Sequence, residues 1–206
     1  MEDEARIRIA IALFDGAEEL DWAGPWEVLA AWGRLWPQDG VDVFTVADQP
    51  GIVRCANGLG VAADHSWDDA GRIDVVVYPG GIGTLKQLGD ERVRTRMRTL
   101  AASVPVMASV CTGSLVFADA GLLDGLPATT HWGSLADLAG LGKDIEVRAD
   151  DRYVDTGAII TAAGVSAGID MALHLIARLH SPERAGQVRR VIQYEPSGHN
   201  AAIPFS

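Results

Sequence analysis

Several residue types and patterns that mark large classes of protein are scarce in this chain. Its 206 residues include two cysteines, Cys55 and Cys111, and neither lies in a CxxC pattern, so we expect no metal site built on thiolates. Two free thiols fit the reducing cytoplasm, which is the location we expect. No apolar run is long enough to cross a bilayer. Residues 1–4 are acidic and polar, unlike a secretory signal.

Basic residues are also scarce. The chain has 17 Lys and Arg against 28 Asp and Glu, which gives a formal net charge of −11. Nucleic acids and anionic membranes select basic surfaces, so we expect neither as a partner. Hydrophobic residues make up 48% and charged residues 22%, as in ordinary globular proteins. We therefore expect a single domain over residues 1–206 with a core of its own.

Buried strands alternate with helical segments along the chain. The apolar runs that we expect to be strands cover residues 6–14, 41–46, 74–78 and 104–108, and later 145–147, 153–156 and 159–162. An extended excursion over 52–63 contains Asn57-Gly58, which predicts a hairpin. Residues 128–132 are expected to be a short strand end, and Pro25 is expected in the first turn of a helix that ends near Leu35. This alternation predicts an α/β three-layer sandwich, with a mostly parallel sheet covered by helices on both faces.

The stretch from Val104 to Leu123 is the most informative part of the sequence. A short apolar strand turns at Ser109-Val110-Cys111-Thr112-Gly113 into an apolar helix, which is the arrangement of a nucleophile elbow. A helix N-terminus favours a thiolate, so Cys111 is a candidate nucleophile. The simpler interpretation is a small core residue, the common role of a free cysteine. The strand-to-helix corner favours the nucleophile, whereas Cys55 lacks such a context.

Other candidate residues follow neighbouring strands. The carboxyl ends of parallel strands meet at one edge of a sheet, and that edge collects Asp21, Gly80, Gly81, Cys111 and His131. Asp21 stands between Leu20 and Trp22, so it is expected to be buried with a perturbed pKa, or else to cap a helix. The preceding acids, Glu18 and Glu19, are interpreted as a solvated turn.

Two further roles at this edge stay open on the residues alone. An N–H group of Gly80-Gly81, together with that of Thr112, is expected to form an oxyanion-type site. A cysteine nucleophile usually needs an acid or base nearby, and His131 is a candidate for a Cys–His pair. Nothing in the spacing requires that pair, and the residue directly after Cys111 is a threonine.

Taken together, these segments resemble the ThiJ/PfpI superfamily over nearly the whole chain. The fold that this resemblance implies is flavodoxin-like and close to the class I glutamine amidotransferase domain. The segments that carry it are 13–16, 20–25, 78–81, 109–114, 120–123, 128–132 and 167–170. The proteases of the superfamily carry His directly after the Cys. This chain has Thr112 at that position, so we do not expect protease activity.

Within the superfamily, Leu20-Asp21, residues 110–114 and Thr130-His131-Trp132 look most similar to the members that hydrate isocyanides. The resemblance implies a homodimer without a cofactor or metal that converts a small isocyanide to an N-substituted formamide. Cys111 matches the nucleophile, Asp21 the acid/base and Thr112 their neighbour. Gly80, Gly81, His131 and Trp132 are then expected to bind the substrate.

Two other functions are compatible with the same residues. One is a ligand- or redox-sensing protein, because the same sequence segments also resemble the N-terminal domain of some AraC-type regulators. Such regulators need a basic helix-turn-helix region behind this domain. The sequence is acidic and stops at Ser206, so we expect a stand-alone regulator to be disfavoured. The other is a thiol-dependent hydratase of the glyoxalase type that acts on ketoaldehydes.

Overall fold

The computed structural model describes residues 6–49 and 51–195, so the acidic start at residues 1–4 lies outside the described part. Its centre is a seven-stranded sheet with the order β10-β11-β7-β6-β1-β2-β5. The strands are β1 (Ile7–Ala12), β2 (Val41–Ala47), β5 (His65–Ser66), β6 (Val75–Tyr78), β7 (Val106–Val110), β10 (Tyr153–Asp155) and β11 (Ile159–Ala162). Neighbouring strands run parallel except β10 and β11, which are antiparallel.

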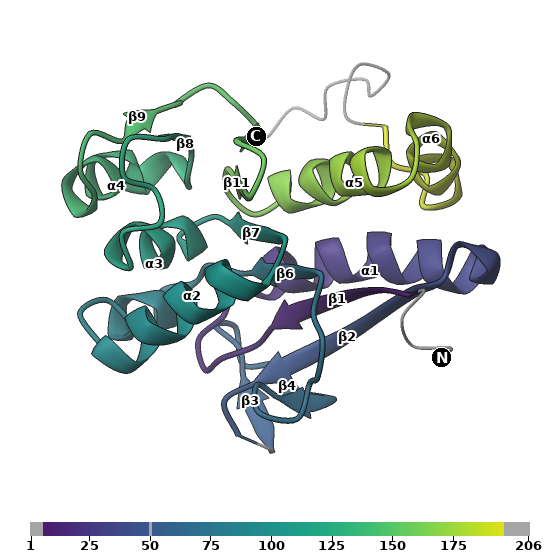
Figure 1. Ribbon diagram of the computed structural model, residues 1–206, viewed down its shortest axis with the longest axis horizontal. Coiled ribbons are helices and arrows are strands. Elements are labelled where there is room, and N and C mark those ends of the chain that lie inside the picture. Colours follow the sequence, from purple (N-terminus) through teal and green to yellow (C-terminus); the bar gives the residue numbers. More distant parts are fainter. Residues whose placement is uncertain (1–5, 50, 196–206) are drawn as a thin grey trace, which may run out of the picture.

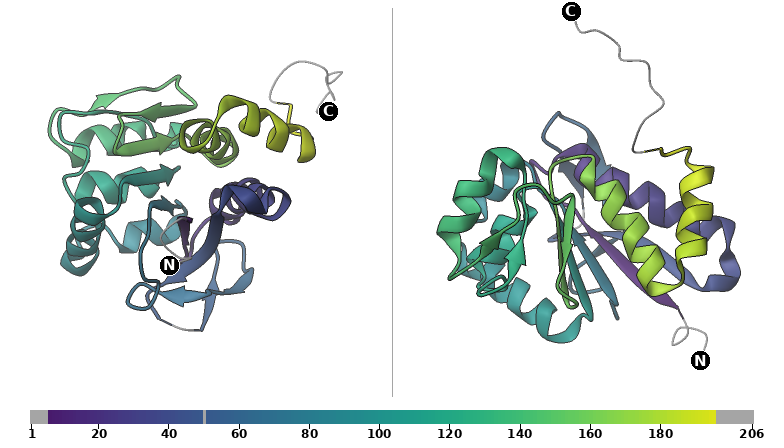
Figure 2. Two further views of the ribbon diagram at one scale, coloured as in Figure 1. Left: turned by 45° about the vertical axis from the view of Figure 1, so that its right-hand side comes forward. Right: turned by 90° about the horizontal axis from the view of Figure 1, so that it is seen from above.

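Helices cover both faces of the sheet, as Figures 1 and 2 show. One face carries α1 (Glu19–Leu35), α5 (Ala167–Leu179) and α6 (Pro182–Val191), and the other carries α2 (Glu91–Ser103), α3 (Gly113–Asp119) and α4 (Leu135–Leu141). Successive side chains of β1 alternate between the two cores: Ile9 and Ile11 pack toward α1 and α5, whereas Ala10 and Ala12 pack toward α2 and α3. The predicted α/β fold, with a mostly parallel sheet between helices, is confirmed.

Smaller elements lie outside the central sheet and its covering helices. The strands β3 (Ile52–Arg54) and β4 (Gly60–Ala62) form the predicted hairpin around Asn57-Gly58. The strands β8 (Pro127–Ala128) and β9 (Glu146–Val147) form a second two-stranded sheet. The short 3₁₀ turns are η1 (Pro37–Asp39), η2 (Ile82–Lys86) and η3 (Trp132–Ser134). The strand expected over 128–132 therefore ends at Ala128, because the chain turns into η3 instead of continuing to pair.

The helix α1 begins earlier than the position of Pro25 indicates. It starts at Glu19, so Pro25 lies inside the helix and not in its first turn. A proline there removes one helical hydrogen bond. The ring packs closely on the backbone of α5, since a Cβ built on Gly168 would lie 3.1 Å from Pro25 Cγ. This tertiary contact stabilises a proline that local preference disfavours, and the early start of α1 places Asp21 in its first turn.

Three adjacent strands, β1, β6 and β7, end at the same edge of the sheet. The segment after β1 leads to Asp21, the segment after β6 contains Gly80 and Gly81, and β7 is followed directly by Cys111. The parallel order of the sheet thus gathers residues that lie about ninety positions apart in the sequence. Within the described residues, no helix is long and apolar enough to cross a membrane.

Candidate functional site

Cys111 occupies the corner between β7 and α3, as the sequence predicts. Its backbone is in the left-handed region, with φ at +56°, which is strained for a residue with a side chain. Hydrogen bonds hold this corner: the Cys111 N–H lies 3.0 Å from Ala162 O, and the Thr130 hydroxyl donates to Cys111 O at 2.9 Å. The strained backbone places the side chain at the end of the sheet, 6% exposed.

Two glycines allow the backbones to meet at this corner. A Cβ built on Gly113 would lie 2.5 Å from Tyr78 O, and one built on Gly80 would lie 2.5 Å from Thr112 N. Both neighbours are backbone atoms that cannot move aside. The absence of side chains at Gly80 and Gly113 therefore brings the loop after β6 against the nucleophile elbow.

Asp21 lies in the first turn of α1 and is completely buried, with an exposed fraction of 0%. Its Oδ2 accepts the N–H of Gly80 at 2.9 Å, whereas its Oδ1 is buried without a hydrogen-bond partner among the described residues. Burial raises the pKa of this carboxyl to about 7, and the negative charge of Glu18 acts in the same direction. The predicted buried acid is confirmed. The alternative of a helix cap is wrong, because Glu18 occupies the cap position.

The thiol of Cys111 interacts with the carboxyl of Asp21. Burial raises the pKa of Cys111 to about 12, and the charge of Asp21 raises it further, although the N–H groups of Thr112 and Val165 oppose the shift. A helix N-terminus favours a thiolate, yet the pKa of this cysteine is raised and not lowered. The helix α3 has seven residues, and its field is outweighed by desolvation and by the neighbouring carboxylate.

Thr112 connects the elbow to the glycine loop. Its Oγ1 accepts the N–H of Gly81 at 2.9 Å, and the Thr84 hydroxyl lies 3.1 Å from the same oxygen. The N–H groups of Gly80 and Gly81 thus bind Asp21 and Thr112. They orient the acid and the elbow, and they do not form the oxyanion-type site that the sequence indicated.

A cavity of about 250 Å³ opens over the thiol. Its lining consists of Glu18, Gly81, Ile82, Thr84, Leu85, Cys111, Thr112, His131, Ser134 and Val165. Asp21 and Gly80 lie beneath this lining, in contact with the elbow. Sequence reasoning did not name six of the lining residues as site members: Glu18, Ile82, Thr84, Leu85, Ser134 and Val165.

His131 belongs to the cavity wall and does not pair with the nucleophile. Its Nδ1 accepts the N–H of Gly133 at 3.2 Å, and no hydrogen bond joins it to Cys111 within the described part of the chain. Trp132 stacks obliquely on His131 at 5.3 Å, is 79% exposed and does not line the cavity. The acid that accompanies Cys111 is Asp21, as the resemblance implied.

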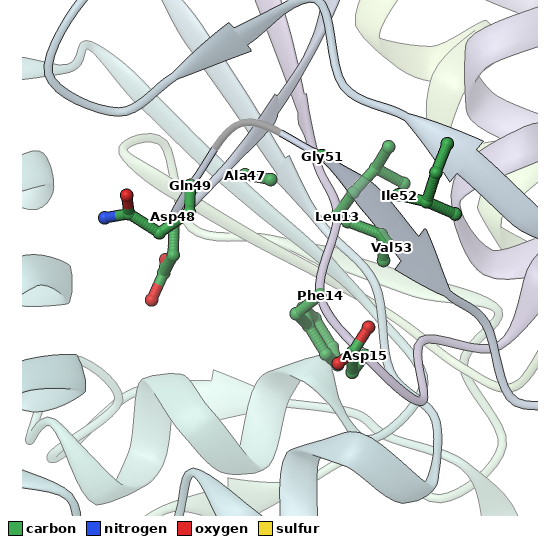
Figure 3. A pocket seen from close by; sticks show the side chains of 9 residues that line it. All are labelled: Leu13, Phe14, Asp15, Ala47, Asp48, Gln49, Gly51, Ile52 and Val53. Atoms are coloured by element: carbon green, nitrogen blue, oxygen red, sulfur yellow. The ribbon is translucent and has the colours of Figure 1, made fainter.

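A second pocket, of about 320 Å³, lies at the end of β1 and beside the segment that follows β2 (Figure 3). Its lining includes Phe14, Asp15, Asp48 and Gln49 and contains neither cysteine nor histidine. It therefore lacks the nucleophile. Among the described residues, no group of three His, Cys, Asp or Glu side chains is placed to hold a metal ion. At the Cys111 cavity, a thiol lies beside a buried acid whose pKa is raised.

Comparison with known proteins assigns the fold and this elbow to a family. The chain belongs to the DJ-1/PfpI family, whose model matches residues 7–178. An isonitrile hydratase of Pseudomonas putida is 35% identical over 191 residues, which are 93% of this chain and 80% of that protein. The HTH-type transcriptional regulator GbdR of Pseudomonas aeruginosa is 32% identical over 143 residues, 69% of this chain and 38% of the regulator. The structure of a ThiJ/PfpI family protein from Pseudomonas syringae superposes with a TM-score of 0.83 at 29% identity, covering 97% of this chain and 79% of that one.

Proposed function

We propose that this protein hydrates isocyanides to N-substituted formamides, with Cys111 as the nucleophile and Asp21 as the acid/base. The observation that carries the proposal is the buried pair itself. Between pH values of about 7 and about 12, the pKa values of Asp21 and Cys111 leave one proton on the two groups. Similarity to an isonitrile hydratase supports the same reaction.

The terminal carbon of an isocyanide, R–N≡C, accepts both a nucleophile and a proton. In the first step, the proton of Cys111 moves to Asp21, the sulfur bonds to the terminal carbon, and Asp21 delivers the proton to that same carbon. The product is a thioimidate, R–N=CH–S–Cys111, which contains every atom of the thiol and the isocyanide. A single carboxyl group thus acts first as base and then as acid.

Water completes the reaction. The Asp21 carboxylate takes a proton from water as the water oxygen bonds to the thioimidate carbon, and it passes this proton to the nitrogen. The tetrahedral adduct then expels sulfur while Asp21 moves the remaining hydroxyl proton to that sulfur, and the product is R–NH–CHO. The sum is R–N≡C plus water, so the cycle returns Cys111 and Asp21 to their starting forms. The buried position of Asp21 holds its pKa near neutrality, where both directions of proton transfer are accessible.

Turnover of a neutral isocyanide, followed by chromatography of the formamide, tests this proposal. The wild type is expected to form the formamide, and Cys111→Ala and Asp21→Asn are expected to lose at least about a thousandfold in kcat/KM, the scale of losing a nucleophile or an acid/base. Cys55→Ala, which removes the other buried cysteine, is the matched control and is expected to turn over normally. A folded wild type that converts methylglyoxal and not isocyanides would refute the proposal.

A ligand-sensing role is the second candidate, favoured by the similarity to a transcriptional regulator. A sensor is expected to bind a small molecule in the Cys111 cavity without consuming it. For redox sensing, the thiol would have to be oxidised, and burial raises the pKa of Cys111, which opposes the thiolate that oxidants attack. Calorimetric binding of an isocyanide by a wild type that produces no formamide would move the assignment to this role.

We also propose that the protein is a homodimer. The supporting feature is an apolar face around Trp26 of α1, which is exposed beside a hollow of about 550 Å³ that reaches Val61 of the hairpin. Burying such a face against a second copy is favourable. Light scattering on a sizing column is expected to give twice the mass of the 21.9 kDa chain, and Trp26→Glu is expected to shift it to the monomer. A wild-type mass of one chain would contradict the dimer.

A further inference from the structure

Glu18 is the one side chain with a formal charge among the described residues that line the Cys111 cavity. It lies between β1 and α1, where its N–H donates to Gly80 O at 2.9 Å. Its Oε1 accepts from Asn57 Nδ2 at 3.2 Å, so the turn of the β3–β4 hairpin supports the carboxylate. This residue is thus a built part of the cavity and not a solvated turn.

The other lining groups do not neutralise this charge. Ile82, Leu85 and Val165 are apolar, the threonines and Ser134 are neutral hydroxyls, and neither Lys nor Arg is among the described lining residues. The ring of His131 uses Nδ1 as an acceptor for the N–H of Gly133. The influence of Glu18 reaches the reacting pair, since its charge contributes to the raised pKa of Asp21. The net charge of −11 has the same sign. A substrate that enters this cavity therefore meets a negative field next to the thiol.

We propose that Glu18 makes the cavity selective for isocyanides whose substituent carries a cationic group, and that it disfavours substituents that carry a carboxylate. This inference rests on the proposed hydratase function and names its substrate class. The terminal carbon has to reach the sulfur of Cys111, so the substituent extends past the remaining lining. The apolar side chains of Ile82 and Leu85 suit the alkyl part, and Glu18 suits an ammonium group.

Three isocyanides of similar size test the selectivity by turnover: trimethylammonioethyl isocyanide, its neutral carbon isostere neohexyl isocyanide, and the anion isocyanopropanoate. For the wild type, kcat/KM is expected to be about tenfold higher for the cation than for the isostere and lower for the anion, as befits one charge pair in a partly solvated site. Glu18→Gln keeps an acceptor for Asn57, and its ratio of kcat/KM for the cation to kcat/KM for the neutral isostere is expected to fall close to one. Glu19→Gln is the matched control.

Glu19 makes a suitable control because it is the same residue type, also binds Asn57 and does not line the cavity. Its variant has the same net charge as Glu18→Gln and is expected to keep the wild-type ratio. Equal ratios in the wild type and Glu18→Gln, or a preference for the carboxylate, would overturn the inference. An equal loss of selectivity in both variants would also overturn it, because a general charge effect would then explain the preference.

A second measurement does not require turnover. Cationic and anionic methanethiosulfonates convert a thiol to a mixed disulfide and release methanesulfinate, and peptide mapping counts the reaction at Cys111 alone. Each rate of Cys111 modification is normalised to the rate of a free thiol with the same reagent. The cation-to-anion ratio of these rates is expected to be about tenfold higher in the wild type than in Glu18→Gln. If isocyanides are not hydrated but this ratio is found, the proposed function fails and the charge selectivity of the cavity stands. If isocyanides are hydrated but neither turnover nor thiol modification prefers the cation, the proposed function stands and the role of Glu18 fails.

Discussion

The pH dependence of turnover follows from the protons on Cys111 and Asp21. The reacting pair needs one proton, so Asp21 has to be ionised while Cys111 is still a thiol. The pKa of Asp21 is about 7, which means that lowering the pH removes the active form. Two pH units below that value, about 1% of the pair holds a single proton, so kcat/KM at pH 5 is expected to be about a hundredfold below its plateau.

The assay measures kcat/KM for a neutral isocyanide between pH 5 and pH 9, with a blank at each pH for uncatalysed hydrolysis in acid. A neutral substrate does not titrate, so the profile reports the free enzyme. The rate is expected to rise through about pH 7 and then to level off, because the thiol of Cys111 titrates far above this range. A rate that is highest at pH 5 and falls through pH 7 would show that the doubly protonated pair is active, and it would refute the mechanism.

One variant shifts this profile without removing a reacting group. The charge of Glu18 raises the pKa of Asp21, so Glu18→Gln is expected to lower that pKa and to move the midpoint of the profile to lower pH. Glu19→Gln makes the same change in net charge and is expected to leave the midpoint in place. A midpoint that moves equally in both variants, or upward in Glu18→Gln, would contradict the assignment of the titration to Asp21.

Three stability predictions follow from the same contacts. Because the pKa of Asp21 is raised from 3.8 to about 7, the folded state binds more protons than the unfolded chain between these pH values, and stability falls as the pH rises through that window. Ionising the buried carboxyl costs about 4 kcal/mol of stability above this window. Asp21→Asn removes that cost and is expected to raise the melting temperature at pH 8 but not at pH 4. Thr112→Val leaves the Gly81 N–H without its acceptor and is expected to cost about 1–3 kcal/mol in urea unfolding, unlike Thr112→Ser. Gly113→Ala places a Cβ 2.5 Å from a carbonyl oxygen of β6 and is expected to cost about 2 kcal/mol or more, whereas Gly140→Ala in α4 meets open space and is expected to be neutral or stabilising.

The sequence predicts the parts of the site that depend on strand order. Alternating strands and helices imply a parallel sheet, and a parallel sheet gathers the residues that follow its strands at one edge. Asp21 and Cys111 could be placed together on that basis, and the apolar neighbours of Asp21 indicated its burial. The glycines of this edge were also identified, although their N–H groups serve the acid and Thr112 instead of an oxyanion.

Other features depend on contacts between distant segments and could not be read locally. Glu18 has the sequence context of a solvated turn, and it joins the cavity because the Asn57 turn folds back on it. Pro25 is accommodated within α1 by its packing on Gly168 of α5. Trp132 belongs to a motif that suggested substrate binding, yet the η3 turn directs it to solvent.

The protonation state of Cys111 shows a different limit. A helix N-terminus lowers the pKa of a thiol, whereas burial and a neighbouring carboxylate raise it, and the sequence indicates all three influences. Their balance depends on the depth of the sulfur and on the length of α3, which are properties of the packed structure. Burial dominates here and raises the pKa of Cys111, so the proposed mechanism assigns removal of the thiol proton to Asp21.

Formation of formamide at Cys111 is the most direct test of the account. Wild type, Cys111→Ala and Cys55→Ala are incubated at pH 8 with the same neutral isocyanide, and the initial rate of formamide formation is measured above the blank. Turnover by the wild type and Cys55→Ala, with a loss of at least about a thousandfold in Cys111→Ala, is the expected result. Formamide formation at equal rates by all three proteins, or none by a folded wild type, would contradict the claim that this cavity is an isocyanide-hydrating site.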